Sequence, residues 1–161
     1  MTGFIALCFF LRAMKLGMTC RVVTTSVAEH HLKVLWGEIG RFLVDCKVPL
    51  LVRDSGPLVV NHMEVRRASE VDAKNPLNYL VGRVSEKGEG LAGHHADWTL
   101  GIGDEASGID DKVYEMFQGW ASGTPGRRGR GLKRMLFIGN PNPTDNFFKK
   151  ACKAGDLVVS N

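Results

Sequence analysis

Residues 98–105 have the sequence Trp-Thr-Leu-Gly-Ile-Gly-Asp-Glu, a short apolar run that ends in two adjacent carboxylates. Runs of this length and apolarity are typical of buried strands in parallel sheets. Behind the run, apolar side chains recur at helical spacing and mark one face of a helix. They are Ile109, Val113, Met116, Phe117 and Trp120. A strand that leads into an amphipathic helix is the repeating unit of α/β folds.

The same alternation extends upstream. Residues 4–14 have helix-forming composition and end near Gly17, and residues 21–25 are rich in β-branched side chains, as in a buried strand. Ser26 and Glu29 have the spacing of a capping box, which predicts that a helix begins here. Its apolar face is the set Leu32, Leu35, Trp36, Ile39, Phe42 and Leu43.

Shorter elements follow. Residues 48–52 and 58–60 flank a Ser-Gly-Pro turn and predict a hairpin, and residues 78–84 predict a further strand. Downstream lie a strand at 135–138, a helix capped by Thr144 that holds Phe147 and Phe148, and a strand that begins at Leu157. We therefore predict an α/β fold in which helices cover both faces of a mostly parallel sheet, within a single domain spanning residues 1–161.

Composition limits the function classes only loosely. The chain has 161 residues, 44% of them hydrophobic, which is enough for one core of ordinary domain size. A net charge of +4 permits a polyanionic partner without requiring one. The four cysteines have no metal-finger spacing, and the most apolar run, residues 4–11, is shorter than the roughly 20 residues that cross a bilayer. We expect a cytoplasmic protein without a membrane partner.

The carboxylates Asp104 and Glu105 are the first candidates for chemistry, because Walker B elements of nucleoside triphosphatases also place two carboxylates at the end of an apolar strand. A buried strand fixes the first carboxylate, so that Asp104 can hold Mg²⁺ through its water shell. The second, Glu105, can then orient and deprotonate the attacking water. Gly101 and Gly103 depart from the bulky residues usual in such strands, and a strand that ends in Asp-Glu before a turn is also common elsewhere.

A second strand end supplies two more candidates. Residues 135–138 are followed by Gly139, Asn140 and Pro141. In nucleotide-driven motors a polar side chain at a neighbouring strand end often senses the γ-phosphate, which makes Asn140, next to Gly139, the candidate sensor. The alternative is an Asn-Pro turn after a strand, a frequent use of these residues.

A basic segment at residues 127–134 holds five cations in eight residues. They are Arg127, Arg128, Arg130, Lys133 and Arg134. Such a segment can grip a DNA backbone or offer an arginine to the nucleotide of a neighbouring subunit. The alternative is a solvated loop without a partner.

Several of these segments together resemble one family. Residues 89–96, 103–108 and 138–141 with 146–148 are similar to the ATPase domain of phage terminase large subunits and their prophage relatives. Residues 22–26 and 34–39 are similar to the second strand and helix of that domain, so the resemblance spans roughly residues 4–150. It implies a RecA-like P-loop ATPase core that uses ATP and Mg²⁺. The implied partners are double-stranded DNA, terminase subunits and the portal, in the host cytoplasm if the protein is viral.

The chain also departs from this family. Terminases carry G-x-x-x-x-G-K-[ST] after their first core strand, where backbone amides and the lysine hold the phosphates. The 161 residues contain no such motif and no counterpart of the C-terminal nuclease domain. We therefore expect an incomplete ATPase domain that hydrolyses ATP poorly or not at all, and we assign ATP and Mg²⁺ to the complete parent domain only. In the usual strand order, the edge of residues 135–138 would be left bare.

Two alternatives to the packaging ATPase stay open. One is a non-enzymatic remnant or binding module that associates with nucleic acid or a motor subunit. The other is a fragment of a helicase-like ATPase, which also has Asp-Glu at a strand end. It is disfavoured because the chain has no Ser-Ala-Thr type motif and no second motor domain.

Overall fold

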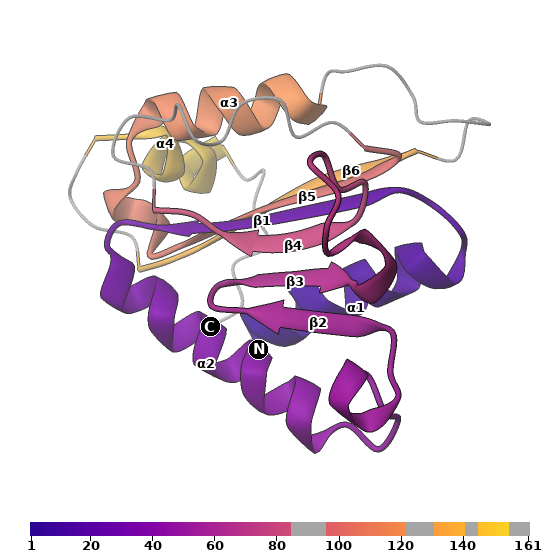
Figure 1. The fold of residues 1–161 in the computed structure, drawn as a ribbon. Coiled ribbons are helices and arrows are strands. Elements are labelled where there is room, and N and C mark those ends of the chain that lie inside the picture. The colour runs from indigo at the N-terminus through magenta and orange to yellow at the C-terminus, as the bar shows by residue number, and fades with distance from the viewer. Residues whose placement is uncertain (85–95, 122–130, 141–144, 155–161) are drawn as a thin grey trace.

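One six-stranded sheet organises the part of the chain that the computed structural model describes, residues 1–84, 96–121, 131–140 and 145–154 (Figure 1). The strand order is β2-β3-β4-β1-β5-β6. The strands are β1 (Cys20–Ser26), β2 (Leu58–Asn61), β3 (Glu64–Arg67), β4 (Tyr79–Gly82), β5 (Trp98–Asp104) and β6 (Leu132–Ile138). Strands β4, β1, β5 and β6 run parallel, whereas β2 and β3 form an antiparallel hairpin at one edge.

In the described part of the chain, α-helices cover both faces of this sheet. Helices α1 (Thr2–Lys15) and α2 (Glu29–Asp45) lie on one face, and α3 (Asp111–Ala121) and α4 (Phe147–Ala154) lie on the other (Figure 1). Among the described residues, the connections hold the 3-10 helices Val52–Asp54, Ala68–Glu70 and Ala106–Gly108. The prediction of an α/β fold with a mostly parallel sheet and flanking helices is confirmed. Within the described helices, none has both the length and the apolarity that crossing a membrane would require.

The two faces of β5 are packed in different ways. Leu100 and Ile102 join the core beneath α1 and α2. On the opposite face, a Cβ added at Gly101 would lie 2.9 Å from the ring of Phe117, and one at Gly103 would lie 2.5 Å from the ring of Phe137. Aromatic side chains from α3 and β6 thus fill the space that bulky β5 residues would take, which explains the glycines in this strand.

The predicted capping box at the start of α2 is wrong. Ser26 belongs to β1, and its Oγ donates a hydrogen bond to the carbonyl of Asp104 at 3.0 Å, because the parallel register places Ser26 opposite Asp104. The N-cap of α2 is Ala28, which makes no side-chain cap. Glu29 instead pairs with Lys33 at 3.0 Å on the helix surface.

The predicted hairpin is also wrong in its strands. Residues 58–61 pair with residues 64–67, and residue Leu51 makes only a single parallel bridge to Leu58. The physical reason is that the chain does not simply reverse near Gly56. The amides of Asp54 and Gly56 both donate to the carbonyl of Leu51, at 2.9 and 2.7 Å, so the segment closes a full loop and continues in its former direction.

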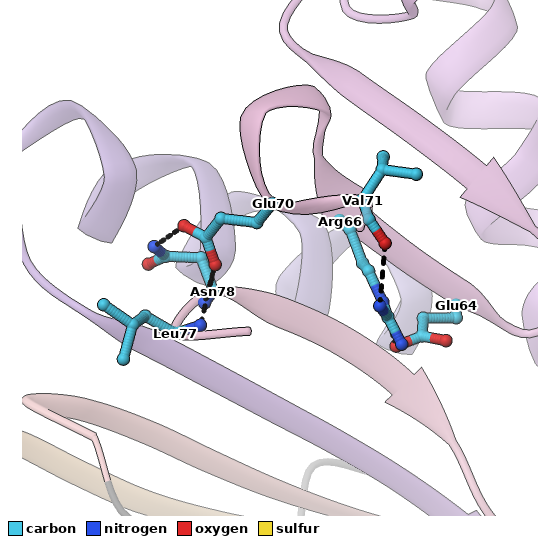
Figure 2. A network of polar contacts seen from close by, with 6 residues as sticks. All are labelled: Glu64, Arg66, Glu70, Val71, Leu77 and Asn78. Carbon is cyan, nitrogen blue, oxygen red and sulfur yellow. Dashed lines mark hydrogen bonds and ion pairs between the residues drawn. The ribbon is translucent and has the colours of Figure 1, made fainter. Parts of the chain in front are cut away.

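A polar network fixes the connection between β3 and β4 (Figure 2). The carboxylate of Glu70 accepts hydrogen bonds from the amides of Leu77 at 2.7 Å and Asn78 at 2.9 Å, and from Asn78 Nδ2 at 2.6 Å. Asn78 Oδ1 in turn accepts from the amide of Cys20 at the start of β1, at 3.0 Å. Burial of Glu70 opposes ionisation, but the bonds from Asn78 and Leu77 outweigh it and lower the pKa of Glu70. The network therefore links the connection before β4 to the start of β1.

Several predicted features fall beyond the described ranges. The structure does not describe the predicted cap Thr144 or the strand predicted from Leu157. Three of the basic residues also lie outside the described residues, namely Arg127, Arg128 and Arg130.

Candidate functional site at the carboxyl ends of β1, β5 and β6

The chain turns to opposite faces of the sheet after β1 and after β5. From β1 it leads into α2 on one face, and from β5 it leads into α3 on the other. The two strands are direct neighbours, and Ser26 at the end of β1 pairs with Asp104 at the end of β5. In open parallel sheets, ligands bind outside the carboxyl ends of the strands at such a switch in direction. The topology alone therefore makes this edge the first place to look for a site.

The two predicted carboxylates stand at this point. Asp104 is partly buried and Glu105 is exposed. Burial, and next the charge of Glu105, raise the pKa of Asp104. His31 and Glu38 on α2 also act on this carboxyl, His31 lowering its pKa and Glu38 raising it. Asp104 thus sits in a partly desolvated, net acidic environment, in which a bound cation would relieve the repulsion between the two carboxylates.

Glu105 has an unusual backbone conformation. Its φ of 53° and ψ of 46° place it in the left-handed region, which residues with a Cβ seldom adopt. Such a conformation costs about 1–2 kcal/mol and persists only where the surroundings enforce it. The residues that hold this turn come from β1, the turn itself, α3 and the residue before α4.

The carbonyls of residues 104–107 each accept a hydrogen bond. Ser26 Oγ donates to the first at 3.0 Å, and the amide of Gly108 donates to the second at 3.1 Å. The hydroxyl of Tyr114, on α3, donates to the third at 2.9 Å, and Nδ2 of Asn146 donates to the fourth at 2.8 Å. Burial raises the pKa of Tyr114, which keeps its hydroxyl protonated as a donor. Hydrogen bonds therefore hold the turn that carries Glu105 both before this residue, at Asp104, and after it, at Ala106 and Ser107.

The end of β6 packs directly on this turn. Asp104 pairs with Ile138, and a Cβ added at the following residue, Gly139, would lie 2.7 Å from the amide nitrogen of Ala106. Only a glycine allows the chain to pass so close. Asn140 follows and is exposed. The structure therefore brings the predicted site residues Asp104, Glu105, Gly139 and Asn140 to adjoining strand ends.

The start of α1 lies near the same edge. The amino group of Met1 pairs with Glu38 at 3.2 Å, and Glu38 is one of the groups that raise the pKa of Asp104. No side chain caps α1. The first amides of a helix have no partner within the helix and favour negative charge, so this end of α1 suits an anionic group.

The basic residues of β6 lie elsewhere. Lys133 pairs with Thr99 near the start of β5, whereas Asp104 lies at its end, five residues further along the paired strands. At about 3.3 Å per residue the separation along the strand is about 17 Å. Lys133 and Arg134 are thus not neighbours of the carboxylates along the sheet.

Sequence reasoning missed three residues that hold the turn. Ser26 was predicted to cap a helix, directly after a strand at residues 21–25. Tyr114 lies three residues before Phe117, a helical spacing that could have placed it on the buried face of α3. Asn146 gave no local signal, because its partner Ser107 is 39 residues away.

Comparisons of the chain with models of protein families, with curated proteins and with solved structures find no match. The site therefore has to be interpreted from its own chemistry. Within the described ranges, no three His, Cys, Asp or Glu side chains are grouped so that they could hold a metal ion. The available donors are the carboxylates of Asp104 and Glu105, hard oxygen ligands that suit Mg²⁺, an ion that keeps several waters and needs few protein ligands. The hydroxyl of Ser26 is buried and donates to the carbonyl of Asp104.

Proposed function

We propose that this chain is part of a terminase-like ATPase core, a RecA-like P-loop domain whose parent couples ATP hydrolysis to the movement of double-stranded DNA into a capsid. The observation that carries the proposal is the meeting of three adjacent strand ends. Glu105 is held in a left-handed turn after β5, between Ser26 of β1 and Gly139 after β6. Nucleotide chemistry requires its carboxylates and polar side chains at such a place.

Each residue has a distinct role in this proposal. Asp104 holds Mg²⁺ through its water shell, and the ion would neutralise charge on the phosphates. Glu105 orients the attacking water and accepts its proton. Asn140, exposed beyond Gly139, responds to the γ-phosphate and relays its loss to the rest of the motor. Lys133 and Arg134 are candidates for contact with DNA or with a neighbouring subunit.

The strand order supports the same proposal. In the order β4-β1-β5-β6, the strand that carries the proposed sensor is the last one among the described strands. A phosphate-loop strand would pair at this position in the proposed fold. Met135 on β6 is 38% exposed, although the apolar residues Leu136, Phe137 and Ile138 follow it in the strand. The uncapped start of α1 would then follow the phosphate loop.

The sequence sets a limit on activity. Without G-x-x-x-x-G-K-[ST], the backbone amides and the lysine that stabilise charge on the phosphates are lacking. We therefore expect the 161-residue chain by itself to bind and hydrolyse ATP poorly.

The test compares this chain with a version extended at its N-terminus by a strand and a Gly-Lys-Thr loop. Binding of a fluorescent ATP analogue with Mg²⁺ and release of phosphate are measured for both. We expect only the extended form to bind and hydrolyse, and Glu105→Gln to abolish hydrolysis while sparing binding. Glu115→Gln, an equivalent change at an exposed position on α3, is the matched control and should leave both unchanged.

The opposite outcome is equally informative. If the extended form folds but neither binds nor hydrolyses ATP, the assignment of Asp104 and Glu105 to nucleotide chemistry is wrong. A binding module that associates with nucleic acid or a motor subunit then takes its place, and retention of the chain on a DNA column at low salt would test that function.

A further inference from the structure

Asn146 joins the turn after β5 to the start of α4. The side chain is buried, with 8% of its surface exposed. Its Nδ2 donates to the carbonyl of Ser107 at 2.8 Å, while its Oδ1 accepts from the amide of Lys149 at 3.2 Å. One amide group therefore caps α4 and also holds the 3-10 turn that follows Glu105.

Two further contacts connect the same regions. The amide of Phe147 donates to Asp111 Oδ1 at 2.8 Å, which ties the first residue of α4 to the first residue of α3. The ring of Tyr114 lies between those of Phe137 on β6 and Phe147 on α4, with centroid distances of 4.3 and 4.5 Å. Tyr114 is the residue whose hydroxyl holds the carbonyl of Ala106. The start of α4 thus supports the turn through a direct bond and through Tyr114.

We propose that Asn146 is a positioning residue for Glu105, which keeps this glutamate in its left-handed conformation with α4 as the support. The carbonyl of Ser107 loses its side-chain donor when Nδ2 is removed. Because Ser107 is buried, the 3-10 turn then gains by rotating that carbonyl toward another donor or toward water. Glu105 is released toward conformations that residues with a Cβ prefer. The catalytic meaning of this support rests on the function proposed above.

A purely structural role of Asn146 is the competing explanation, and two variants separate it from positioning. Asn146→Asp keeps the oxygen that accepts from Lys149, and aspartate is a good N-cap, so α4 should persist. It loses the donor to Ser107 and places a carboxylate oxygen there instead, which repels that carbonyl. Asn146→Ala loses both bonds and should weaken the start of α4 as well. Asp145→Asn, an exposed neighbouring change, serves as the control.

The experiment is residue-resolved NMR on the 161-residue chain. The Cα and Cβ chemical shifts of Glu105 report its backbone conformation, and amide exchange of Gly108 reports the bond to the carbonyl of Glu105. In Asn146→Asp we expect the Glu105 shifts to leave left-handed values and Gly108 to exchange about fivefold faster. The amides of Lys149 and Ile39 should keep their protection, because the cap and α2 are intact.

Two results would overturn the proposal. One is that Glu105 keeps its wild-type shifts in Asn146→Asp. The other is that the amides of Gly108 and Ile39 accelerate equally, which would make Asn146 a contributor to global stability only. No nucleotide is needed for these measurements. The positioning role and the ATPase function can therefore fail separately, the first by unchanged Glu105 shifts and the second by absent nucleotide binding in the extended form.

Discussion

Replacing Gly101 by alanine tests the packing on which the α3 face of β5 depends. The added Cβ would lie 2.9–3.0 Å from three ring atoms of Phe117. That ring is fully buried and cannot withdraw, because Trp120 and Phe137 lie against it with centroid distances of 4.5 and 5.6 Å. The substitution must therefore shift either the strand or the aromatic cluster.

The expected loss follows from two opposing effects. Overpacking a well-filled core costs about 1–3 kcal/mol. Replacing a glycine within a strand by alanine stabilises the folded state by about 0.5–1 kcal/mol, because glycine loses the most backbone freedom on folding. The two effects span about 0–2.5 kcal/mol, and we expect Gly101→Ala to lower the free energy of unfolding by about 1 kcal/mol, near the middle of that range. For a chain of 161 residues this corresponds to a fall in Tm of about 2–4 °C.

The assay is urea unfolding followed by circular dichroism, with Gly37→Ala as the matched control. Gly37 lies on the exposed face of α2, and nothing lies within 4 Å of a Cβ added there. Alanine in a helix should raise the free energy of unfolding by about 0.8–1 kcal/mol. The same substitution of glycine by alanine is thus expected to lower the free energy of unfolding at position 101 and to raise it at position 37. If Gly101→Ala proves as stable as the wild type, the aromatic cluster is not the fixed body that we infer.

Three further predictions concern the turn after β5. Gly139→Ala should abolish ATP hydrolysis by the extended form in a phosphate-release assay, because its Cβ would lie 2.7 Å from the amide of Ala106 and displace the turn. Tyr114→Phe should lower the free energy of unfolding in urea by about 1 kcal/mol, since the carbonyl of Ala106 loses the buried hydroxyl donor and keeps only the amide of Ile109, at 3.2 Å. Asp104→Asn should raise the urea midpoint at pH 7 but not at pH 3. Folding raises the pKa of Asp104, so the ionised carboxylate opposes folding only once the pH has risen through that pKa, and asparagine removes this penalty.

The helices and parallel strands could be predicted because their signals are local. The apolar face of α2 and the β-branched run of β1 require no knowledge of the rest of the chain. The hairpin could not be assigned in this way. Residues 48–52 and 58–60 are both apolar and flank a turn, but the loop closed by Asp54 and Gly56 sends them in the same direction. A turn composition predicts that the chain bends, but it does not predict whether the chain reverses its direction.

In the candidate site, too, some residues could be predicted from local signals and others could not. Asp104, Glu105 and Gly139 could be placed together in advance, because the carboxyl ends of neighbouring parallel strands meet at one edge of a sheet. The residues that hold the turn could not be placed there from the sequence. Tyr114 and Asn146 bond to carbonyls 8 and 39 residues away, and such contacts depend on how α3 and α4 settle on the sheet.

The glycines of β5 connect the core to this turn. Gly103 departs from the bulky residues usual in a Walker B strand, and the space it leaves is occupied by Phe137. Phe137 in turn packs against Tyr114, with ring centroids 4.3 Å apart, and Tyr114 holds the carbonyl of Ala106 beside Glu105. A bulky side chain at 103 would displace Phe137 and remove the support of Tyr114. Glycine at 103 in place of a bulky residue is therefore compatible with a functional strand end. In this chain the aromatic side chains of Phe137 and Tyr114, rather than side chains of β5, support the turn that carries Glu105.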